Sequence, residues 1–233
     1  MAKRLWMVSA LSCCLLAETF TPLPALADRR LRCRRQTKGG STEHVSLSMR
    51  RGAMRRGATV EPQQAWDGSM SQLEFMQKDE CIVVDDRDTI TGTANKYDTH
   101  TFGHETPRGV CHRAFSVFLF DEQGRLLLQQ RASSKITFPS VWTNTCCSHQ
   151  LIGFEPTEVD GPDDVASGAV PGAKRAAVRK LKHELGIEPA ELPLESFKYL
   201  TRLHYWAADT VTHGPSAEWG EHEIDYVLFV QGK

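Results

Sequence analysis

The sequence lacks an apolar run long enough to cross a membrane and lacks the cysteine pattern of a disulfide-stabilised domain. Its longest apolar stretch, residues 5–17, is shorter than the roughly 20 residues of a transmembrane helix. Of its 7 cysteines, 3 fall within the first 33 residues, and Cys146 and Cys147 are adjacent. Because a disulfide between neighbours closes a strained ring, we expect free thiols in a reducing compartment.

Acidic residues are scarce at the N-terminal end, where residues 1–60 hold 12 Lys/Arg but only 3 Asp/Glu. The remaining residues hold 16 Lys/Arg and 26 Asp/Glu, so neither a nucleic-acid partner nor membrane contact of the mature form is expected. Residues 1–27 are signal-like and residues 28–58 are Arg- and Ser-rich like a transit peptide. A targeting leader over residues 1–58 predicts a plastid location. An ordinary single transit peptide and a cytoplasmic protein are the alternatives.

A polar linker is expected at residues 59–77 and one α+β domain at residues 78–233, with a mixed β-sheet sandwich and flanking helices. Helix 172–185 has an apolar stripe and ends at Gly186. The expected strands are 81–85, 89–93, 113–120, 125–130, 199–205 and 224–230. The expected irregular segments are a loop at 96–109, an exposed excursion at 151–170 and a loop at 207–217.

Two short motifs carry most of the chemistry. Residues 143–149 (TNTCCSH) place a thiol two positions from an imidazole, and residues 219–226 (WGEHEIDY) hold two carboxylates at i and i+2. Each motif alone is compatible with a structural role, but together they suit an acid/base site supported by a metal. The candidate metal ligands are His100, His112, His149, Glu221 and Glu223, with His104 competing with His100.

Such a set of nitrogen and oxygen ligands suits an octahedral divalent ion and favours Mn²⁺ or Zn²⁺ over Mg²⁺. Basic side chains flank the same loops at Lys96, Arg131 and Lys135. Convergent Arg and Lys suit a diphosphate, although solvated surface charge is the simpler reading of any lone lysine.

Residues 179–187 resemble the end of a Nudix box, R-E-U-x-E-E-x-G-U, in which only the last acidic residue, Glu184, is kept. Lys180 and His183 stand in place of other acids of the box, and Pro171 stands where an earlier glutamate is expected. A pyrophosphohydrolase needs this carboxylate cluster to hold its metals. The pattern therefore predicts that the fold is kept and hydrolysis is lost.

Four segments together resemble type I isopentenyl-diphosphate Δ-isomerases, particularly those of plants and green algae. The segments are residues 112–120 (HRAFSVFLF), 126–131 (LLLQQR), 143–149 and 219–226. The resemblance covers roughly residues 78–230. It implies a Nudix-like fold and the interconversion of isopentenyl and dimethylallyl diphosphate in isoprenoid biosynthesis, with the small diphosphate as substrate and a monomeric enzyme.

The resemblance also implies residue roles. Cys147 and Glu223 are the two acid/base groups, and Tyr205 relays a proton to Glu223. The first metal is held by His100, His112, His149, Glu221 and Glu223. Glu184 and the backbone carbonyl of Cys147 hold a Mg²⁺ that bridges the diphosphate, which Lys96, Arg131, Lys135 and Ser148 contact.

These roles fit the reaction. Moving the double bond requires a proton to be added at one carbon and removed from another, through a tertiary carbocation. Two groups on opposite faces of the substrate achieve this without moving it. A dry pocket with an aromatic face, Trp142 among its residues, would stabilise the cation and exclude water.

The chain also departs from the family pattern. Gln150 stands where proline is usual, the loop after Tyr205 is lengthened, and the spacing between His100 and His112 varies in the family. Family members continue beyond Lys233, so the domain is expected to lack its C-terminal part, including one wall of the pocket.

Two other functions are compatible with parts of the sequence. One is a Nudix-type pyrophosphohydrolase, which would need the full glutamate cluster. The other is a non-enzymatic metal-binding module in which Cys146, Cys147 and His149 hold one zinc ion, although adjacent cysteines rarely ligate one zinc in a closed site.

Overall fold

The computed structural model describes residues 3–7 and 71–232, so most of the expected leader and linker lies outside the described residues. The described strands form a 9-stranded mixed sheet. They are β1 (Lys3–Met7), β2 (Glu80–Val84), β3 (Ile90–Asn95), β4 (His112–Phe120), β5 (Leu126–Gln130), β6 (Trp142–Thr143), β7 (Cys146–His149), β8 (Lys198–Ala208) and β9 (Gly220–Gln231). The described helices are α1 (Gln72–Lys78), α2 (Lys96–His100), α3 (Pro162–Ser167), α4 (Pro171–Leu185), α5 (Thr210–His213) and the 3₁₀ turn η1 (Leu194–Ser196). This confirms the α+β expectation.

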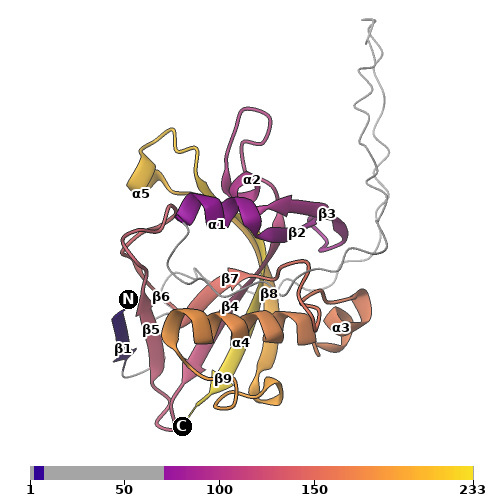
Figure 1. Ribbon diagram of the computed structural model, residues 1–233, viewed down its shortest axis with the longest axis vertical. Coiled ribbons are helices and arrows are strands. Elements are labelled where there is room, and N and C mark those ends of the chain that lie inside the picture. The colour runs from indigo at the N-terminus through magenta and orange to yellow at the C-terminus, as the bar shows by residue number, and fades with distance from the viewer. Residues whose placement is uncertain (1–2, 8–70, 233) are drawn as a thin grey trace, which may run out of the picture. The chain divides into compact units, whose positions relative to one another are not determined.

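Strand β4 lies between the strands that carry most of the candidate site (Figure 1). On one edge it pairs antiparallel with β7, and on the other it pairs in parallel with β9. Strand β8 continues the sheet beyond β9, with Tyr205 opposite Glu223. The first four expected strands form two antiparallel hairpins, because β2 pairs with β3 and β4 pairs with β5.

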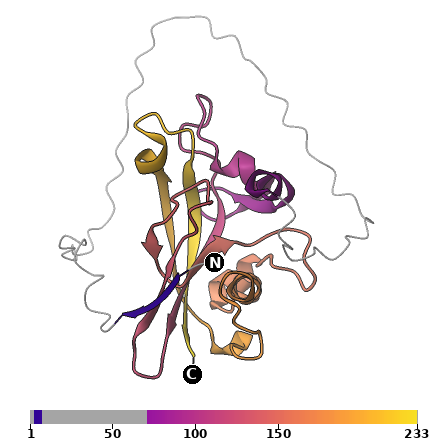
Figure 2. The same cartoon turned by 60° about the vertical axis from the view of Figure 1, so that its left-hand side comes forward.

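Helix α4 packs against one face of this sheet, and Figure 2 shows it end-on beside the strands. Its buried alanines and leucines form one apolar cluster with Phe115 and Tyr226 of the sheet. Gly186 ends the helix at φ 64° and donates its N–H to the carbonyls of Leu181 and Lys182. The left-handed conformation favours glycine there, and the expected C-cap is confirmed.

The expected loop at residues 96–109 is wrong at its start, because α2 occupies residues 96–100. The Asn95 side chain caps this helix by accepting the Asp98 N–H at 2.8 Å. The helical spacing matters for function. Lys96 and His100 are four residues apart, so they lie on the same side of α2.

The expected exposed excursion at residues 151–170 is also partly wrong. It contains α3, and the carboxylates of Glu158 and Asp160 are buried. Asp160 accepts the N–H groups of Gly172 and Ala173 at 2.6 and 2.9 Å. A carboxylate at a helix N-terminus satisfies otherwise unpaired donors, so this segment anchors the start of α4.

Two further segments hold short helices that the sequence analysis did not anticipate. Helix α1 lies mostly within the expected linker and begins at a capping box between Ser71 and Glu74, and α5 lies within the expected loop at 207–217. Strand β1, within the expected leader, pairs with β5; the leader itself stays a prediction. The described helices are all too short or too polar to span a bilayer.

Candidate active site

A cavity of about 350 Å³ opens where α2, β7, β8 and β9 meet. It collects side chains from segments more than a hundred residues apart in the sequence. Of the candidate site residues, it is lined by Lys96, His100, Arg131, Lys135, Trp142, Cys147, Ser148, His149, Tyr205, Glu221 and Glu223. His112 and Glu184 are not among its lining residues.

Strand alternation explains why these residues meet. On β7, Cys147 and His149 lie two residues apart and share one face, and on β9 the same spacing places Glu221 and Glu223 together. Strand β4 lies between them, with His149 paired to Ala114 and Glu223 paired to His112. The spacing read from the sequence therefore matches the placement.

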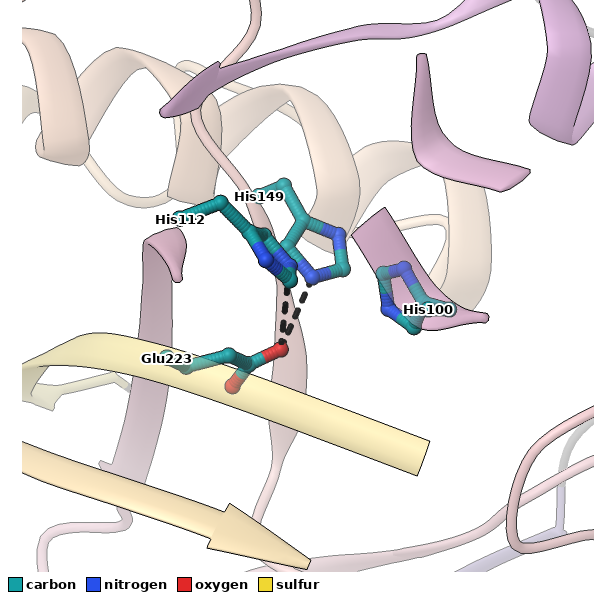
Figure 3. Close-up of side chains that lie close together, drawn as sticks. All are labelled: His100, His112, His149 and Glu223. Atoms are coloured by element: carbon teal, nitrogen blue, oxygen red, sulfur yellow. Dashed lines mark hydrogen bonds and ion pairs between the residues drawn. The ribbon is translucent and has the colours of Figure 1, made fainter. Parts of the chain in front are cut away.

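Three imidazoles form a compact group beside one carboxylate (Figure 3). The ring centroids of His100, His112 and His149 are 4.8–4.9 Å apart. One ligand atom from each ring and one oxygen of Glu223 all lie within 4.8 Å of one another. The exposed His104 is not part of this group, so His100 is the histidine that the fold brings in.

Backbone carbonyls hold two of these rings in the orientation that a metal ligand needs. His100 Nδ1 lies 2.8 Å from the Lys96 carbonyl, and His112 Nδ1 lies 2.8 Å from the Val110 carbonyl. A ring that donates through Nδ1–H keeps a lone pair on Nε2. His112 Nε2 is buried and has no hydrogen-bond partner. An orphaned acceptor aimed at neighbouring ligands fits a divalent cation.

The pKa shifts of the four groups have the same main cause, burial. Burial lowers the pKa of His112 to about 4. Burial, with Lys96 next for His149 and His112 next for His100, holds the pKa of the other two rings well below the usual range. Neutral imidazoles are the form that binds metal. Burial and then Glu221 raise the pKa of Glu223 well above its usual range.

Glu223 contacts two of the candidate groups directly. His149 Nε2 lies 2.9 Å from its Oε1, and the Tyr205 hydroxyl lies 2.6 Å from its Oε2. Glu221 also lines the cavity and lies 3.2 Å from the Tyr205 hydroxyl, but it is outside the four-residue ligand group.

Cys147 lies on the same strand face as His149 and is the half-buried thiol of the cavity. Its Sγ donates to Asn144 Oδ1 at 2.8 Å and lies 3.5 Å from Ser116 Oγ. Burial raises the pKa of this thiol to about 12, so it stays protonated at neutral pH. Cys146 is fully buried on the core side. The expectation of free thiols is confirmed for the described cysteines.

Three cationic side chains, Lys96, Arg131 and Lys135, also line the cavity. Burial, then Lys135, lowers the pKa of Lys96 to about 8. Arg131 donates to the carbonyls of Thr137 and Phe138, which fixes its guanidinium. Because a guanidinium has five N–H donors, others remain for an anion.

Glu184 of α4 has a different environment from the one the sequence suggested. Its carboxylate is paired with Lys180 at 3.1 Å and Lys135 at 3.3 Å and accepts from Gln129 at 3.0 Å. Although burial acts in the opposite direction, Lys180 and Lys135 hold its pKa below the usual range. Both ammonium groups contact Oε1, whereas Gln129 donates to Oε2.

Several cavity residues were missed by the sequence reasoning. Asn144 and Ser116 contact the Cys147 thiol, and Asp225 extends the row of Glu221 and Glu223. The i, i+2 pattern on β9 could have found Asp225. The contacts of Ser116 depend on the pairing of β4 with β7, which no local sequence signal specifies. Cys146 and Cys147 belong to neither group of possible metal ligands among the described residues, which argues against the non-enzymatic zinc module.

The chain is similar to proteins of one family along most of its described length. The NUDIX domain model matches residues 111–233. Isopentenyl-diphosphate delta-isomerase of Schizosaccharomyces pombe is 49% identical over 172 residues, covering 73% of this chain and 69% of the relative. Isopentenyl-diphosphate Delta-isomerase 1 of Bos taurus is 48% identical, covering 65% and 60%. Isopentenyl-diphosphate Delta-isomerase II, chloroplastic, of Arabidopsis thaliana is 43% identical, covering 68% and 51%.

The matched segment includes every residue of the candidate active site from His112 onward. The chain spans between about half and about two thirds of the length of the curated relatives that it matches. The NUDIX domain match and this level of identity point to the same relatives. The His/Glu group of the cavity is compatible with a divalent metal ion. The chain belongs to the isopentenyl-diphosphate delta-isomerase family.

Proposed function

We propose that this chain interconverts isopentenyl diphosphate and dimethylallyl diphosphate. One observation carries the proposal: a single cavity is lined by the Cys147 thiol, by the Glu223–Tyr205 pair and by three cationic side chains. The acid/base groups suit the allylic end of such a substrate, and the cations suit its diphosphate.

The two acid/base groups must hold one transferable proton between them. Burial favours the neutral thiol of Cys147, and burial with Glu221 favours the protonated form of Glu223, so either group can be the acid once the other has lost its proton. In either direction the protonated group gives its proton to a terminus of the double bond while the ionised group takes one from the carbon on the far side, so the overall charge does not change. Tyr205 holds Glu223 through its 2.6 Å hydrogen bond and provides a path for the proton to be replaced.

The cationic intermediate and the diphosphate need opposite environments. Trp142 lines the cavity and offers an aromatic face, which attracts a carbocation. Lys96, Arg131, Lys135 and Ser148 also line it and suit the diphosphate oxygens. Binding at the diphosphate fixes the hydrocarbon end without touching the reacting carbons.

The first metal would be held by His100, His112, His149 and Glu223, with Glu221 completing the set from the edge of the cavity. A divalent ion there supplies positive charge that fixes the Glu223 carboxylate and tunes its acidity. The ligand chemistry favours Mn²⁺ or Zn²⁺ at this site. Glu184, with the backbone carbonyl of Cys147, would hold the Mg²⁺ beside the diphosphate.

Isotope incorporation tests the proposal directly. The chain, loaded with Mn²⁺ or Zn²⁺ and supplied with Mg²⁺, is incubated with isopentenyl diphosphate in D₂O. We expect dimethylallyl diphosphate that carries deuterium, and we expect its rate of formation to fall by about 10³-fold with Cys147→Ala. Release of phosphate without isomerised product would support the pyrophosphohydrolase instead and would reject the proposal.

The relatives include a protein named as chloroplastic and others that are not. The proposed plastid location therefore rests on the sequence of residues 1–58 alone. A fluorescent protein fused after residue 58 should be imported into plastids, and the same fusion without residues 28–58 should not. A diffuse cytoplasmic signal from the full fusion would reject this location. The purified chain is expected to run as a monomer in size-exclusion chromatography.

A further inference from the structure

A second group of potential metal ligands lies on the other face of the sheet. Cys111, His204 and His222 each offer one ligand atom, and these atoms lie within 4.8 Å of one another. Each is a sequence neighbour of a candidate active-site residue: Cys111 precedes His112, and His204 precedes Tyr205. Because neighbouring strand residues point to opposite faces, the group lies behind the cavity.

The distances suit a tetrahedral ion. His204 Nε2 lies 3.0 Å from His222 Nε2, and Cys111 Sγ lies 4.0 Å from His204 Nε2. Nitrogen and sulfur ligands about 2.0–2.3 Å from a tetrahedral ion are separated by roughly 3.3–3.6 Å. Shifts of a few tenths of an ångström would bring these two separations into that range, and the third pair of ligand atoms lies within 4.8 Å.

The backbone already holds the three ligands in place. Residues His204 and His222 belong to the long β8–β9 pairing, and their rings stack at 12° with centroids 5.2 Å apart. His222 Nδ1 lies 3.2 Å from the Gly109 carbonyl, which fixes the ring and places its lone pair on Nε2, where it faces His204 Nε2 at 3.0 Å. The Cys111 carbonyl accepts the Val84 N–H at 3.0 Å. The ligands would therefore lose little freedom on binding.

Access is also provided, because His204 is exposed and Cys111 and His222 are half-buried. One thiolate and two imidazoles form a soft to borderline donor set, which favours Zn²⁺ over Mg²⁺. Three protein ligands leave a fourth position for water.

We propose that Cys111, His204 and His222 form a separate metal site that takes Zn²⁺ or a similar borderline divalent cation. The thiol proton leaves to solvent when the ion binds. The bound ion would fasten β8 and β9 to the start of β4. Because only the folded chain holds these ligands together, binding would raise the melting temperature.

Cobalt gives a readout specific to this site, because Co²⁺ bound to a thiolate shows a near-ultraviolet sulfur-to-metal charge-transfer band, and the His/Glu group of the cavity contains no thiol. The full chain is titrated with Co²⁺ and then with Zn²⁺. We expect the band to appear and Zn²⁺ to remove it. Cys111→Ser should abolish the band, and His204→Ala should weaken the apparent Co²⁺ affinity at least about tenfold.

Two matched variants serve as controls. Cys147→Ser removes the cavity thiol and should keep the band, and His104→Ala removes an exposed histidine outside both groups and should keep the affinity. No band in the wild type, or an undiminished band in Cys111→Ser, would overturn the proposal. Since His204 is exposed, its variant tests the site even if Cys111→Ser does not fold. Wild-type affinity in that variant would equally reject it.

Discussion

The Tyr205 hydroxyl bridges two carboxylates, lying 2.6 Å from Glu223 Oε2 and 3.2 Å from Glu221 Oε2. A phenol has one hydrogen and can donate to only one of them. The other contact is a hydrogen bond only if that carboxyl group carries a proton; otherwise the two oxygens attract each other only weakly or not at all. The three groups therefore share protons, and the hydroxyl is the link between them.

Replacing Tyr205 with phenylalanine removes that link and keeps the ring. We expect Tyr205→Phe to lower kcat by about 10²-fold or more, because a positioned proton-transfer group contributes on that scale. Metal content and melting temperature should change little. Tyr97→Phe is the matched control, since Tyr97 is not a cavity-lining residue. Equal rates for the two variants would contradict the relay.

The two adjacent cysteines should differ sharply. Cys147→Ala should lower turnover by about 10³-fold with metal content intact, because the thiol that faces the cavity is lost. Cys146→Ala should be mild for turnover and reduce stability instead, since its side chain is fully buried in the core. Steady-state kinetics and denaturant unfolding separate the two effects, and reversed effects would show that the thiol assignment is off by one residue.

Of the two glutamates on β9, Glu223 should matter more for the reaction. Glu223→Gln removes both a metal ligand and a proton carrier, whereas Glu221→Gln removes only a group at the edge of the ligand set. We expect kcat of the first variant to be at least about tenfold lower than that of the second when both are saturated with metal. The same kcat in both would leave Glu223 as a ligand alone.

Lys96 should make stability depend on pH in the alkaline range. Burial and then Lys135 lower its pKa from 10.5 to about 8. Between about pH 8 and 10.5 the unfolded chain binds a proton that the folded chain lacks, so this lysine's contribution makes stability rise with pH, by at most about 1.4 kcal/mol per unit.

Melting temperatures at pH 7.5 and 9.5 measure this contribution. The change in melting temperature from pH 7.5 to pH 9.5 should be less positive in Lys96→Met than in the wild type. The exposed Lys78 provides the control, and Lys78→Met should keep the wild-type response. A pH response in Lys96→Met that matches the wild type would show that Lys96 titrates normally.

A methyl group at Gly172 should disturb the start of α4. A Cβ built there lies 2.3 Å from the Glu158 carbonyl oxygen, so backbone must move. We expect Gly172→Ala to destabilise the protein by about 2 kcal/mol or more in urea unfolding. Gly92→Ala is the control, because a Cβ at that position meets no atom within 4 Å. If the free energy of unfolding fell no more in Gly172→Ala than in the control, the segment before α4 would be able to shift at little cost.

Local spacing explains why many of the candidate residues line one cavity. The Cys147–His149 and Glu221–Glu223 pairs follow from strand alternation alone, and the strands themselves carry strong apolar patterns. The family resemblance predicts in addition that the distant segments contribute to one site. No single motif of the chain specifies that His100 meets His112 and His149, since three different elements supply them.

What the sequence did not reveal depends on tertiary contacts. Glu158 and Asp160 lie in a Gly- and Pro-rich stretch that is typical of exposed loops, yet both are buried. Asp160 accepts N–H groups at the first turn of α4, and Glu158 accepts from the Arg179 guanidinium. The motif places Glu184 near a metal. Its pairing with Lys180 follows from their i, i+4 spacing on α4, but its pairing with Lys135 comes from packing between α4 and the loop after β5.

Side chains alternate between the two faces along β9, so the function of this strand depends on its pairing register. Glu221 and Glu223 face the cavity while His222 faces the opposite side with His204. If β9 paired one residue out of step with β4 and β8, His222 would enter the cavity and both glutamates would leave it. A misregistered molecule could retain a compact sheet and bind metal, yet it would have lost its acid/base pair. Single-residue insertions or deletions in β9 are thus far more damaging than substitutions, and libraries for engineering this strand should preserve its length.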